Sequence, residues 1–304
     1  MKIVIVGSGG RLGAALMSEY RDKFEVAGFN HAQLDLSRLD AVREKLRSTN
    51  FDVLINAAAF TNVDLCETHR DQAFLINAEA PGVLAEICRD KNAKLIHFST
   101  DYVFDGEKRE PYTEGDDARP ISVYGESKLK GENNVLAAAS VGEADSFPGT
   151  KRTPQPLIVR VSWVFGPDRP SFVDAMIKRA REEKQIDAIA DKFSTPTYTR
   201  DIAKMLPRFF GLDIQGGILH FANAGECSWQ EYAQWALDCC QGFGIALKTT
   251  TVGALKLSDM QNWVARRPVY SVLSTAKYGA LTGRSPRAWR DAVADYIRRF
   301  YSKK

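Results

Sequence analysis

Short apolar runs alternate with segments of helical periodicity along the first half of the chain. The apolar runs are bounded by polar or glycine-containing segments and are typical of strands, whereas the helical segments repeat apolar residues every three or four positions. Strands are expected at 2–6, 24–29, 51–55, 94–98 and 157–162, and helices at 12–20, 39–46, 73–89 and 123–138. This alternation predicts an α/β fold: a doubly wound, Rossmann-type parallel sheet with helices on both faces.

The last third of the chain has a more mixed pattern, which is typical of a smaller lobe. Helices are expected at 228–240, with Ser228 as N-cap and Glu231 at the capping-box position, and at 287–301. We therefore expect a Rossmann domain over residues 1–165, including the helix at 123–138. Residues 166–304 are expected to form mainly the smaller lobe, with parts that return to the Rossmann core. The polar, turn-rich segment from Ser140 to Pro156 is expected to be an exposed insertion.

Composition and charge exclude several classes of protein. The 304 residues are 44% hydrophobic and 26% charged, with a net charge of +3, so disorder is not expected and neither nucleic acid nor a membrane surface is indicated as a partner. No apolar stretch is long enough to span a membrane. The five cysteines form no C-x-x-C pair and the four histidines show no metal-binding spacing. We expect reduced thiols, no metal site and a cytoplasmic location.

Glycines cluster directly after the first expected strand. Gly7, Gly10 and Gly13 form the pattern G-x-x-G-x-x-G at the start of the next helix. Glycine permits the tight turn and the close approach of backbone N–H groups to a pyrophosphate, and the helix N-terminus favours negative charge. The loop, including Arg11 and Leu12, therefore predicts dinucleotide binding. The alternative is a glycine-rich turn that binds nothing.

The end of the second expected strand indicates which nicotinamide cofactor the loop prefers. Sites for NAD usually carry an acidic residue there, but this chain has Asn30 and His31. Arg11 is in position to meet a 2′-phosphate, which favours NADPH over NADH. Asp35, followed by Leu36, is a candidate contact for the adenine amino group, or else a cap for the next helix.

Tyr124 and Lys128 form the motif Y-x-x-x-K within an expected helix. Residues four apart share one helix face, and a nearby ammonium lowers the pKa of a phenol, which eases proton exchange near neutral pH. Lys128 can also bond the ribose of the nicotinamide. Thr100 ends the fourth expected strand and is a candidate hydrogen-bond donor to the same carbonyl oxygen. Together the three residues indicate reduction of a ketone, although Y-x-x-x-K alone also occurs in ordinary helices.

Several stretches in addition to these motifs resemble the extended short-chain dehydrogenase/reductase family, most closely its dTDP-4-dehydrorhamnose reductase branch. They cover nearly the whole chain in the expected order: 56–64 (NAAAFTNVD), Glu67, Asn77, 99–106 (STDYVFDG), 124–132 (YGESKLKGE), 160–166 (RVSWVFG), 195–197 (TPT) and 267–268 (RP). The resemblance implies that Thr100, Tyr124 and Lys128 are the catalytic residues. It also implies a cofactor cleft lined by Asn56, Ala57, Ala58 and Asn77, and a substrate side formed by Val63, Phe104, Trp163 and Arg267.

The resemblance further implies the reaction. The expected function is reduction, with NADPH or NADH, of a dTDP-4-keto-6-deoxy sugar, a step of dTDP-rhamnose biosynthesis. Two alternatives stay open: a sugar-nucleotide epimerase or dehydratase that retains NAD, and a non-catalytic subunit similar to the regulatory subunit of methionine adenosyltransferase. A homodimer is open as well. Some relatives bridge a dimer through magnesium with a glutamate two residues after the third glycine, and Ala15 at that position argues against such a bridge.

Overall fold

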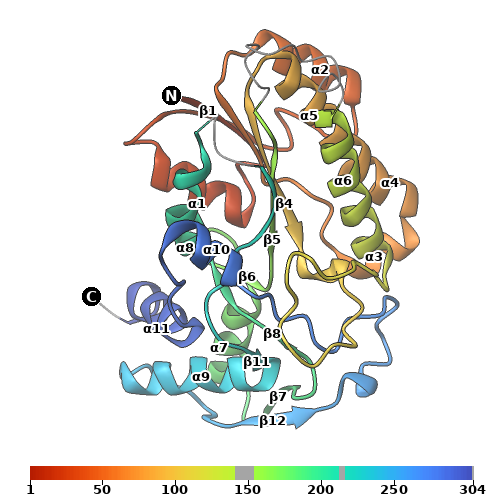
Figure 1. Cartoon of the computed structure of the whole chain (residues 1–304). Helices are drawn as coiled ribbons and strands as arrows, with labels where there is room; N and C mark the ends of the chain where they lie inside the picture. Colours follow the sequence, from red (N-terminus) through yellow and green to blue (C-terminus); the bar gives the residue numbers. More distant parts are fainter. Residues whose placement is uncertain (141–153, 212–215, 303–304) are drawn as a thin grey trace.

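Six parallel strands form the central sheet of the computed structural model, which describes residues 1–140, 154–211 and 216–302 (Figure 1). In spatial order they are β10 (Gly217–His220), β5 (Leu157–Val161), β4 (Lys94–Thr100), β3 (Val53–Asn56), β1 (Lys2–Val6) and β2 (Glu25–Phe29). The first five strands predicted from the sequence are all present and adjacent. The predicted Rossmann-type fold is therefore confirmed.

Helices cover both faces of the sheet, as its apolar strands require. Ile3 and Ile5 point to the face covered by α1 (Arg11–Tyr20), α8 (Thr199–Met205) and α10 (Ala276–Thr282). Val4 and Val6 alternate with them and point to the face covered by α2 (Leu39–Ser48), α5 (Ala80–Asp90) and α6 (Val123–Ser140). Because side chains alternate along a strand, an unbroken apolar run forms two cores.

One expected helix differs in the structure. Instead of a single α-helix over 73–89, the chain forms α4 (Arg70–Phe74), a π-helical turn η1 (Leu75–Glu79) and then α5. A short helix α3 (Val63–Thr68) precedes them, and a 3₁₀ turn η2 (Asp101–Val103) follows β4. The π turn carries Asn77, and such turns are often found at functional sites.

The smaller lobe packs three helices around an aromatic core. They are α7 (Phe172–Glu182), α9 (Trp229–Gly242) and α11 (Trp289–Phe300). The predicted capping box is present, since Glu231 N–H donates to Ser228 Oγ (3.1 Å) and Ser228 N–H to Glu231 Oε2 (2.7 Å). Two-residue or four-residue strand pairs join its loops: β6 (Val164–Phe165) with β9 (Thr197–Tyr198), β7 (Ile186–Ile189) with β12 (Val252–Leu255), and β8 (Phe193–Ser194) with β11 (Cys227–Ser228). Two 3₁₀ turns, η4 (Leu206–Phe209) and η5 (Leu257–Asp259), complete the described elements.

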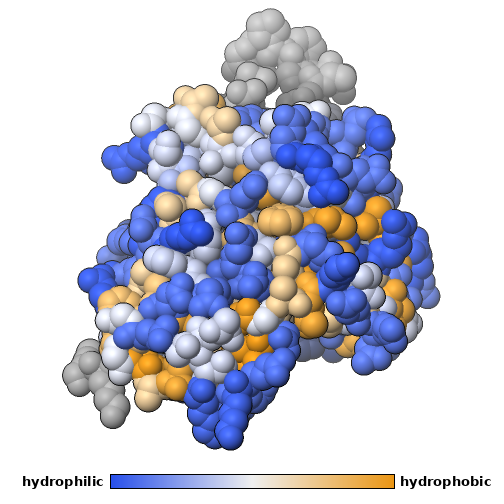
Figure 2. Space-filling view, turned by 90° about the horizontal axis from the view of Figure 1, so that it is seen from below, coloured by the Kyte–Doolittle hydropathy of each residue, from blue (hydrophilic) through white to orange (hydrophobic). Residues whose placement is uncertain are grey.

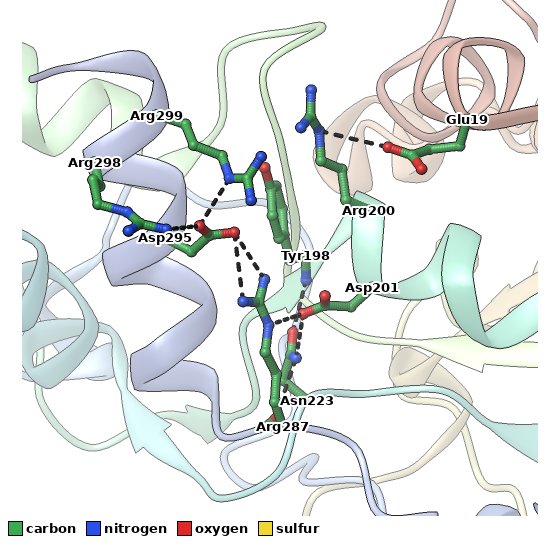
Figure 3. A network of polar contacts seen from close by, with 9 residues as sticks. All are labelled: Glu19, Tyr198, Arg200, Asp201, Asn223, Arg287, Asp295, Arg298 and Arg299. Carbon is green, nitrogen blue, oxygen red and sulfur yellow. Dashed lines mark hydrogen bonds and ion pairs between the residues drawn. The ribbon is translucent and has the colours of Figure 1, made fainter. Parts of the chain in front are cut away.

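Polar contacts tie the C-terminal helix to the Rossmann core (Figure 3). Arg287 donates to Asp201 of α8 (2.7 Å) and lies 3.5 Å from Asp295 of α11. Both α8 and β10 come from the second half of the chain and yet belong to the Rossmann layers. The division of the chain near residue 165 stays a prediction.

Apolar residues at the end of the molecule that carries α9 and β12 lie in separate patches among hydrophilic ones (Figure 2). Among the described residues, no helix combines the length and the apolar character that crossing a membrane requires. All five cysteines are free thiols. Residues 141–153 of the expected insertion lie outside the described part of the chain.

Candidate active site

A cavity of about 1020 Å³ opens where the parallel strands end, which is where ligands bind in sheets of this type. It runs from the end of β2, past the glycine loop and β3, to β4 and the first turn of α6. Most residues predicted from the sequence line it: Gly7, Gly10, Arg11, Leu12, Asn30, Asp35, Leu36, Ala57, Ala58, Val63, Thr100, Tyr124, Lys128 and Trp163. Residues from eight separate segments therefore meet in one space.

The glycine loop owes its shape to two residues that tolerate no side chain. Gly7 has φ of +82°, and a Cβ there would lie 2.7 Å from the backbone nitrogen of Ala58. A Cβ on Gly13 would lie 2.1 Å from the carbonyl oxygen of Gly7, so Gly13 lets α1 approach the loop and does not itself line the cavity. Gly10 is the N-cap of α1 and supplies no capping side chain. The N-terminus of α1 thus faces the cavity with the geometry that binds phosphates.

Arg11 makes a different contact from the one expected. Its guanidinium donates to the carbonyl oxygens of Val164 (3.1 Å), Arg169 (3.2 Å) and Pro170. In return, Arg169 Nε donates to the carbonyl oxygen of Gly9 (3.1 Å). Arg11 therefore joins the glycine loop to the segment after β6, and its contact with a 2′-phosphate stays a prediction.

The polar groups beyond β2 support the turn that shapes this end of the cavity. Asn30 Oδ1 accepts a hydrogen bond from Gln33 N–H (3.1 Å). The carboxylate of Asp35 accepts from the backbone N–H (2.9 Å) and the hydroxyl (2.8 Å) of Ser37, and the bond to the backbone N–H holds the pKa of Asp35 below its ordinary value. Asp35 thus caps the following segment and also lines the cavity, so its two predicted roles are compatible.

Thr100, Tyr124 and Lys128 meet at the centre of the cavity. Thr100 is the last residue of β4, and Tyr124 and Lys128 face it from the first two turns of α6. The helix approaches closely because position 125 is glycine: a Cβ there would lie 2.2 Å from the carbonyl oxygen of Tyr102. Lys128 Nζ donates to the carbonyl oxygen of Phe98 (2.7 Å), which holds the ammonium beside the end of β4.

Burial controls the acidity of this pair. It raises the pKa of Tyr124 above its ordinary value, while a hydrogen bond with Thr100 opposes the increase. Burial also lowers the pKa of Lys128 to about 8, and the nearby Glu132 opposes that decrease. The pKa of Tyr124 is therefore raised, where the sequence predicts a lowering by Lys128, because an apolar environment disfavours the phenolate. At neutral pH, Tyr124 carries its proton and Lys128 its charge.

Two predicted cofactor residues, Asn56 and Asn77, lie behind the cavity wall and shape it. The Asn77 side chain accepts from the N–H of Phe60 (2.8 Å) and donates to the carbonyl oxygen of Phe60 (3.0 Å) and to Ser127 Oγ (3.1 Å). Asn56 Oδ1 accepts from the N–H of Ala58 (3.1 Å). Both therefore hold the loop of residues 57–61, which lines the cavity.

The predicted substrate residues separate into two groups. Trp163 and Val63 line the cavity. Trp163 has φ of +38°, which is rare for a bulky residue and is typical of functional sites, and no described residue accepts the hydrogen of its buried Nε1.

Phe104 and Arg267 do not reach the cavity. Phe104 is fully buried and stacks on Tyr112, with ring centroids 4.1 Å apart. Arg267 donates to both oxygens of Asp64 (3.1 and 2.6 Å) and lies over the ring of Trp263. Hydrophobic packing and a local ion pair therefore satisfy these side chains in the structure.

Several residues that were not predicted as site residues also line the cavity, among them the charged residues Asp101 and Arg169. The Asp101 carboxylate accepts from the hydroxyls of Thr100 (3.1 Å), Ser194 (3.1 Å) and Ser271 (2.5 Å), and burial raises its pKa. Its place directly after Thr100 is a signal in the sequence that could have found it. Arg169 lies in a loop with no recognisable pattern, so no such signal existed.

Comparison with known proteins identifies the family to which the chain is similar. The RmlD substrate binding domain family matches residues 1–302. A dTDP-4-dehydrorhamnose reductase of Mycolicibacterium smegmatis is 36% identical over 97% of this chain and 85% of its own length. The spore coat polysaccharide biosynthesis protein SpsK of Bacillus subtilis is 32% identical over 97% and 96%.

Solved structures agree with the sequence relatives. A dTDP-4-dehydrorhamnose reductase of Clostridium acetobutylicum superposes with a TM-score of 0.86 at 33% identity, over 98% of this chain and 99% of that one. The dTDP-4-dehydrorhamnose reductase of Bacillus anthracis in complex with NADP gives 0.87 at 27% identity, with the same shares. The match to the family over nearly the full length, with the glycine loop and the Thr100–Tyr124–Lys128 group in one cavity, shows that this chain belongs to the RmlD family.

Proposed function

We propose that this chain uses NADPH to reduce the keto group of a dTDP-linked 4-keto-6-deoxy sugar. The observation that carries the proposal is that Thr100, Tyr124 and Lys128 meet in one cavity that the glycine loop and Trp163 also line. Several relatives are named dTDP-4-dehydrorhamnose reductase, and one related structure is a complex with NADP. These names support the class of reaction, the class of substrate and the cofactor.

The residues present fit a dinucleotide. The cavity volume lies at the upper end of the range for ligand pockets, and the N-terminus of α1 offers unsatisfied N–H groups to a pyrophosphate. Arg169 adds positive charge beside the glycine loop. Asn30, Asp35 and Leu36 would hold the adenosine end, and Lys128 the ribose of the nicotinamide.

The chemistry of the step follows from the protonation states of the side chains. When bound, NADPH supplies the hydride that adds to the ketone carbon. Tyr124 gives its hydroxyl proton to the ketone oxygen as that oxygen gains negative charge, and its raised pKa keeps this proton available at neutral pH. The ammonium of Lys128 stabilises the phenolate that remains. The Thr100 hydroxyl would orient the ketone oxygen.

Substrate recognition is assigned to Trp163 and Val63, which both line the cavity. The indole of Trp163 lies against Trp229 (ring centroids 5.6 Å apart), and its buried Nε1 can donate to a polar group of the nucleotide sugar. Val63 provides apolar contact from the N-terminus of α3. The proposal includes a cytoplasmic location, which is consistent with five free thiols.

The test is a spectrophotometric screen. The purified chain is mixed with NADPH or NADH and a panel of 4-keto-6-deoxy sugars linked to dTDP or UDP, and the sugar product is identified. Oxidation of NADPH in proportion to the alcohol formed, with dTDP sugars preferred, supports the proposal. No oxidation with any keto sugar, in a preparation that binds NADPH, overturns it. Tightly held NAD in the purified chain would instead indicate an epimerase or dehydratase.

A further inference from the structure

A row of buried polar groups extends from Lys128 away from the cavity. It consists of Asn56 on β3, His97 on β4 and Lys128 on α6, each at most 1% exposed. Asn56 Nδ2 lies 3.1 Å from His97 Nδ1, and His97 Nε2 lies 3.4 Å from Lys128 Nζ. His97 and Asn56 do not line the cavity, and Lys128 is the cavity-lining residue whose side chain His97 contacts.

The orientation of the Asn56 amide is fixed by its backbone partner. Asn56 Oδ1 faces the N–H of Ala58 at 3.1 Å, and a backbone N–H can only donate. The oxygen must therefore point to Ala58, which leaves the amide nitrogen facing His97. An amide nitrogen also only donates, so Nδ1 of His97 has to accept.

This constraint selects one tautomer of His97. Because Nδ1 accepts, it carries a lone pair, and the single proton of the neutral ring is on Nε2. A doubly protonated ring would place an N–H against the Asn56 N–H. Burial, together with the charge of Lys128, also holds the pKa of His97 well below its ordinary value. Nε2–H is then the group that faces Lys128 Nζ.

We propose that His97 is a positioning residue that presents an N–H to Lys128 and thereby favours release of the Lys128 proton. In this way His97 sets the pH above which the rate of the reaction falls. An N–H repels an ammonium but can donate to the lone pair of a neutral amine. The opposite tautomer would present a lone pair and retain the ammonium. The kinetic part of this inference rests on the proposed ketone reduction, whereas the tautomer does not.

Other charged groups near Lys128 and Tyr124 act in different directions. Glu132, one turn further along α6, raises the pKa of Lys128 but is already paired with Arg160 of β5. Asp101 of η2 and Cys66 of α3 raise the pKa of Tyr124.

The remaining elements packed on this part of α6 contribute less. The pair formed by Arg70 of α4 and Glu126 is largely exposed, and Asn77 of η1 is uncharged. Of the described groups, His97 is therefore the one that contacts Lys128 Nζ and whose facing nitrogen changes between donor and acceptor with the tautomer.

The tautomer is tested first on the unmodified chain, so that the test does not depend on a variant that folds. Nitrogen-15 NMR of histidine-labelled protein distinguishes protonated from unprotonated ring nitrogens. His31 and His69 are exposed, whereas His97 and His220 are buried, and the His97→Phe variant assigns the His97 signals. We expect Nε2 to be protonated and Nδ1 to be unprotonated from about pH 6 to 9. This range spans the ordinary histidine pKa of about 6.5 and the lowered pKa of Lys128. The opposite tautomer, or a charged ring at pH 7, overturns the inference.

The kinetic consequence is tested with Asn56→Asp. This change keeps an acceptor for Ala58 N–H and replaces the donor facing His97 by an acceptor. The His97 proton should move to Nδ1, which NMR can verify, and Nε2 should accept from Lys128. We expect the alkaline midpoint of kcat to rise by about one pH unit.

The matched control is Asn77→Asp, a buried carboxylate beside α6 with no contact to His97. Its alkaline midpoint should move much less than that of Asn56→Asp. Equal movement in both variants would mean that charge alone acts on Lys128, and would overturn the role of His97. If no keto sugar is reduced, the proposed function fails while the NMR result still decides the tautomer. If reduction is normal but the tautomer is Nδ1–H, only the inference fails.

Discussion

Glu132 on α6 and Arg160 on β5 form a two-pronged ion pair with side chains only 1% and 3% exposed. Arg160 Nε donates to Oε1 (2.9 Å) and Nη2 to Oε2 (2.6 Å), while the guanidinium lies over the ring of Phe104. Because α6 also carries Tyr124 and Lys128, the pair fixes the helix of the active site to the central sheet.

Glu132→Gln should destabilise the fold. The change leaves the Arg160 charge buried without its counter-charge, which costs about 3–5 kcal/mol of the free energy of unfolding. Urea unfolding followed by circular dichroism measures the loss. The control is Glu126→Gln on the same helix, whose pair with Arg70 is exposed and should contribute less than about 1 kcal/mol. Equal losses in the two variants would contradict a structural role specific to the buried pair.

Tyr124→Phe should remove the proton donor and leave the cavity intact. We expect kcat for keto-sugar reduction to fall by about 10²–10⁴-fold, with nearly unchanged NADPH binding by fluorescence titration. Tyr102→Phe is a matched control, because Tyr102 also lines the cavity and its ring lies 5.6 Å from that of Tyr124. Turnover close to normal in Tyr124→Phe would rule out the assigned role.

Patterns local in the sequence predicted most of the fold and the centre of the site. The short apolar runs of the strands, the glycine spacing and the four-residue spacing of Tyr124 and Lys128 each reflect a geometry set within a few residues. The capping box at Ser228 and Glu231 was predictable for the same reason. Thr100 could be placed because parallel strands all end at one edge of the sheet.

Features that depend on distant contacts could not be predicted in this way. Arg169 lies beside Gly9 although 160 residues separate them. The family resemblance implies that Phe104 faces the substrate. In the fold its ring instead packs against Tyr112 and His220, which are distant contacts in the sense that the fold brings them together. The raised pKa of Tyr124 follows from burial in the folded cavity, which spacing alone does not reveal. The π turn at Asn77 interrupts a run that keeps ordinary helical periodicity.

Arg169→Ala should weaken the binding of NADPH. Arg169 Nε donates to the carbonyl oxygen of Gly9. Among the described residues none accepts a hydrogen bond from its other nitrogens, which could therefore contact the proposed phosphates. A hydrogen bond to a charged group contributes about 1.5–3 kcal/mol, so we expect the Kd to rise by roughly 10-fold to 100-fold. Fluorescence or calorimetric titration provides the measurement.

Arg179→Ala serves as the control for the loss of one positive charge. Arg179 pairs with Glu183 on the surface of the smaller lobe and does not line the cavity. Its removal should leave the Kd nearly unchanged at moderate salt. A similar Kd in both variants would show that Arg169 does not contact the cofactor.

Lys192→Met should change how stability depends on pH. Lys192 is fully buried; its Nζ donates to the carbonyl oxygen of Pro268 (2.6 Å) and lies over the rings of Tyr102 and Trp163. Burial lowers the pKa of Lys192 to about 8, against an opposing effect of Asp101. Between this value and about 10.4, the unfolded chain keeps a proton that the folded chain has released. In that window, Lys192 therefore makes the fold more stable as pH rises, by up to about 1.4 kcal/mol per pH unit.

The difference between the unmodified chain and Lys192→Met isolates this effect, since buried cysteines and tyrosines titrate in both proteins. Methionine retains the apolar stem and carries no charge. Urea unfolding is measured at pH 7, 8, 9 and 10, a series that spans the window for a lysine with a lowered pKa. The free energy of unfolding of the unmodified chain should rise relative to that of the variant only above about pH 8. A constant difference across the series would mean that Lys192 keeps an ordinary pKa in the fold. If the variant instead gained on the unmodified chain as the pH rose above about 8, the sign of the pKa shift would be contradicted.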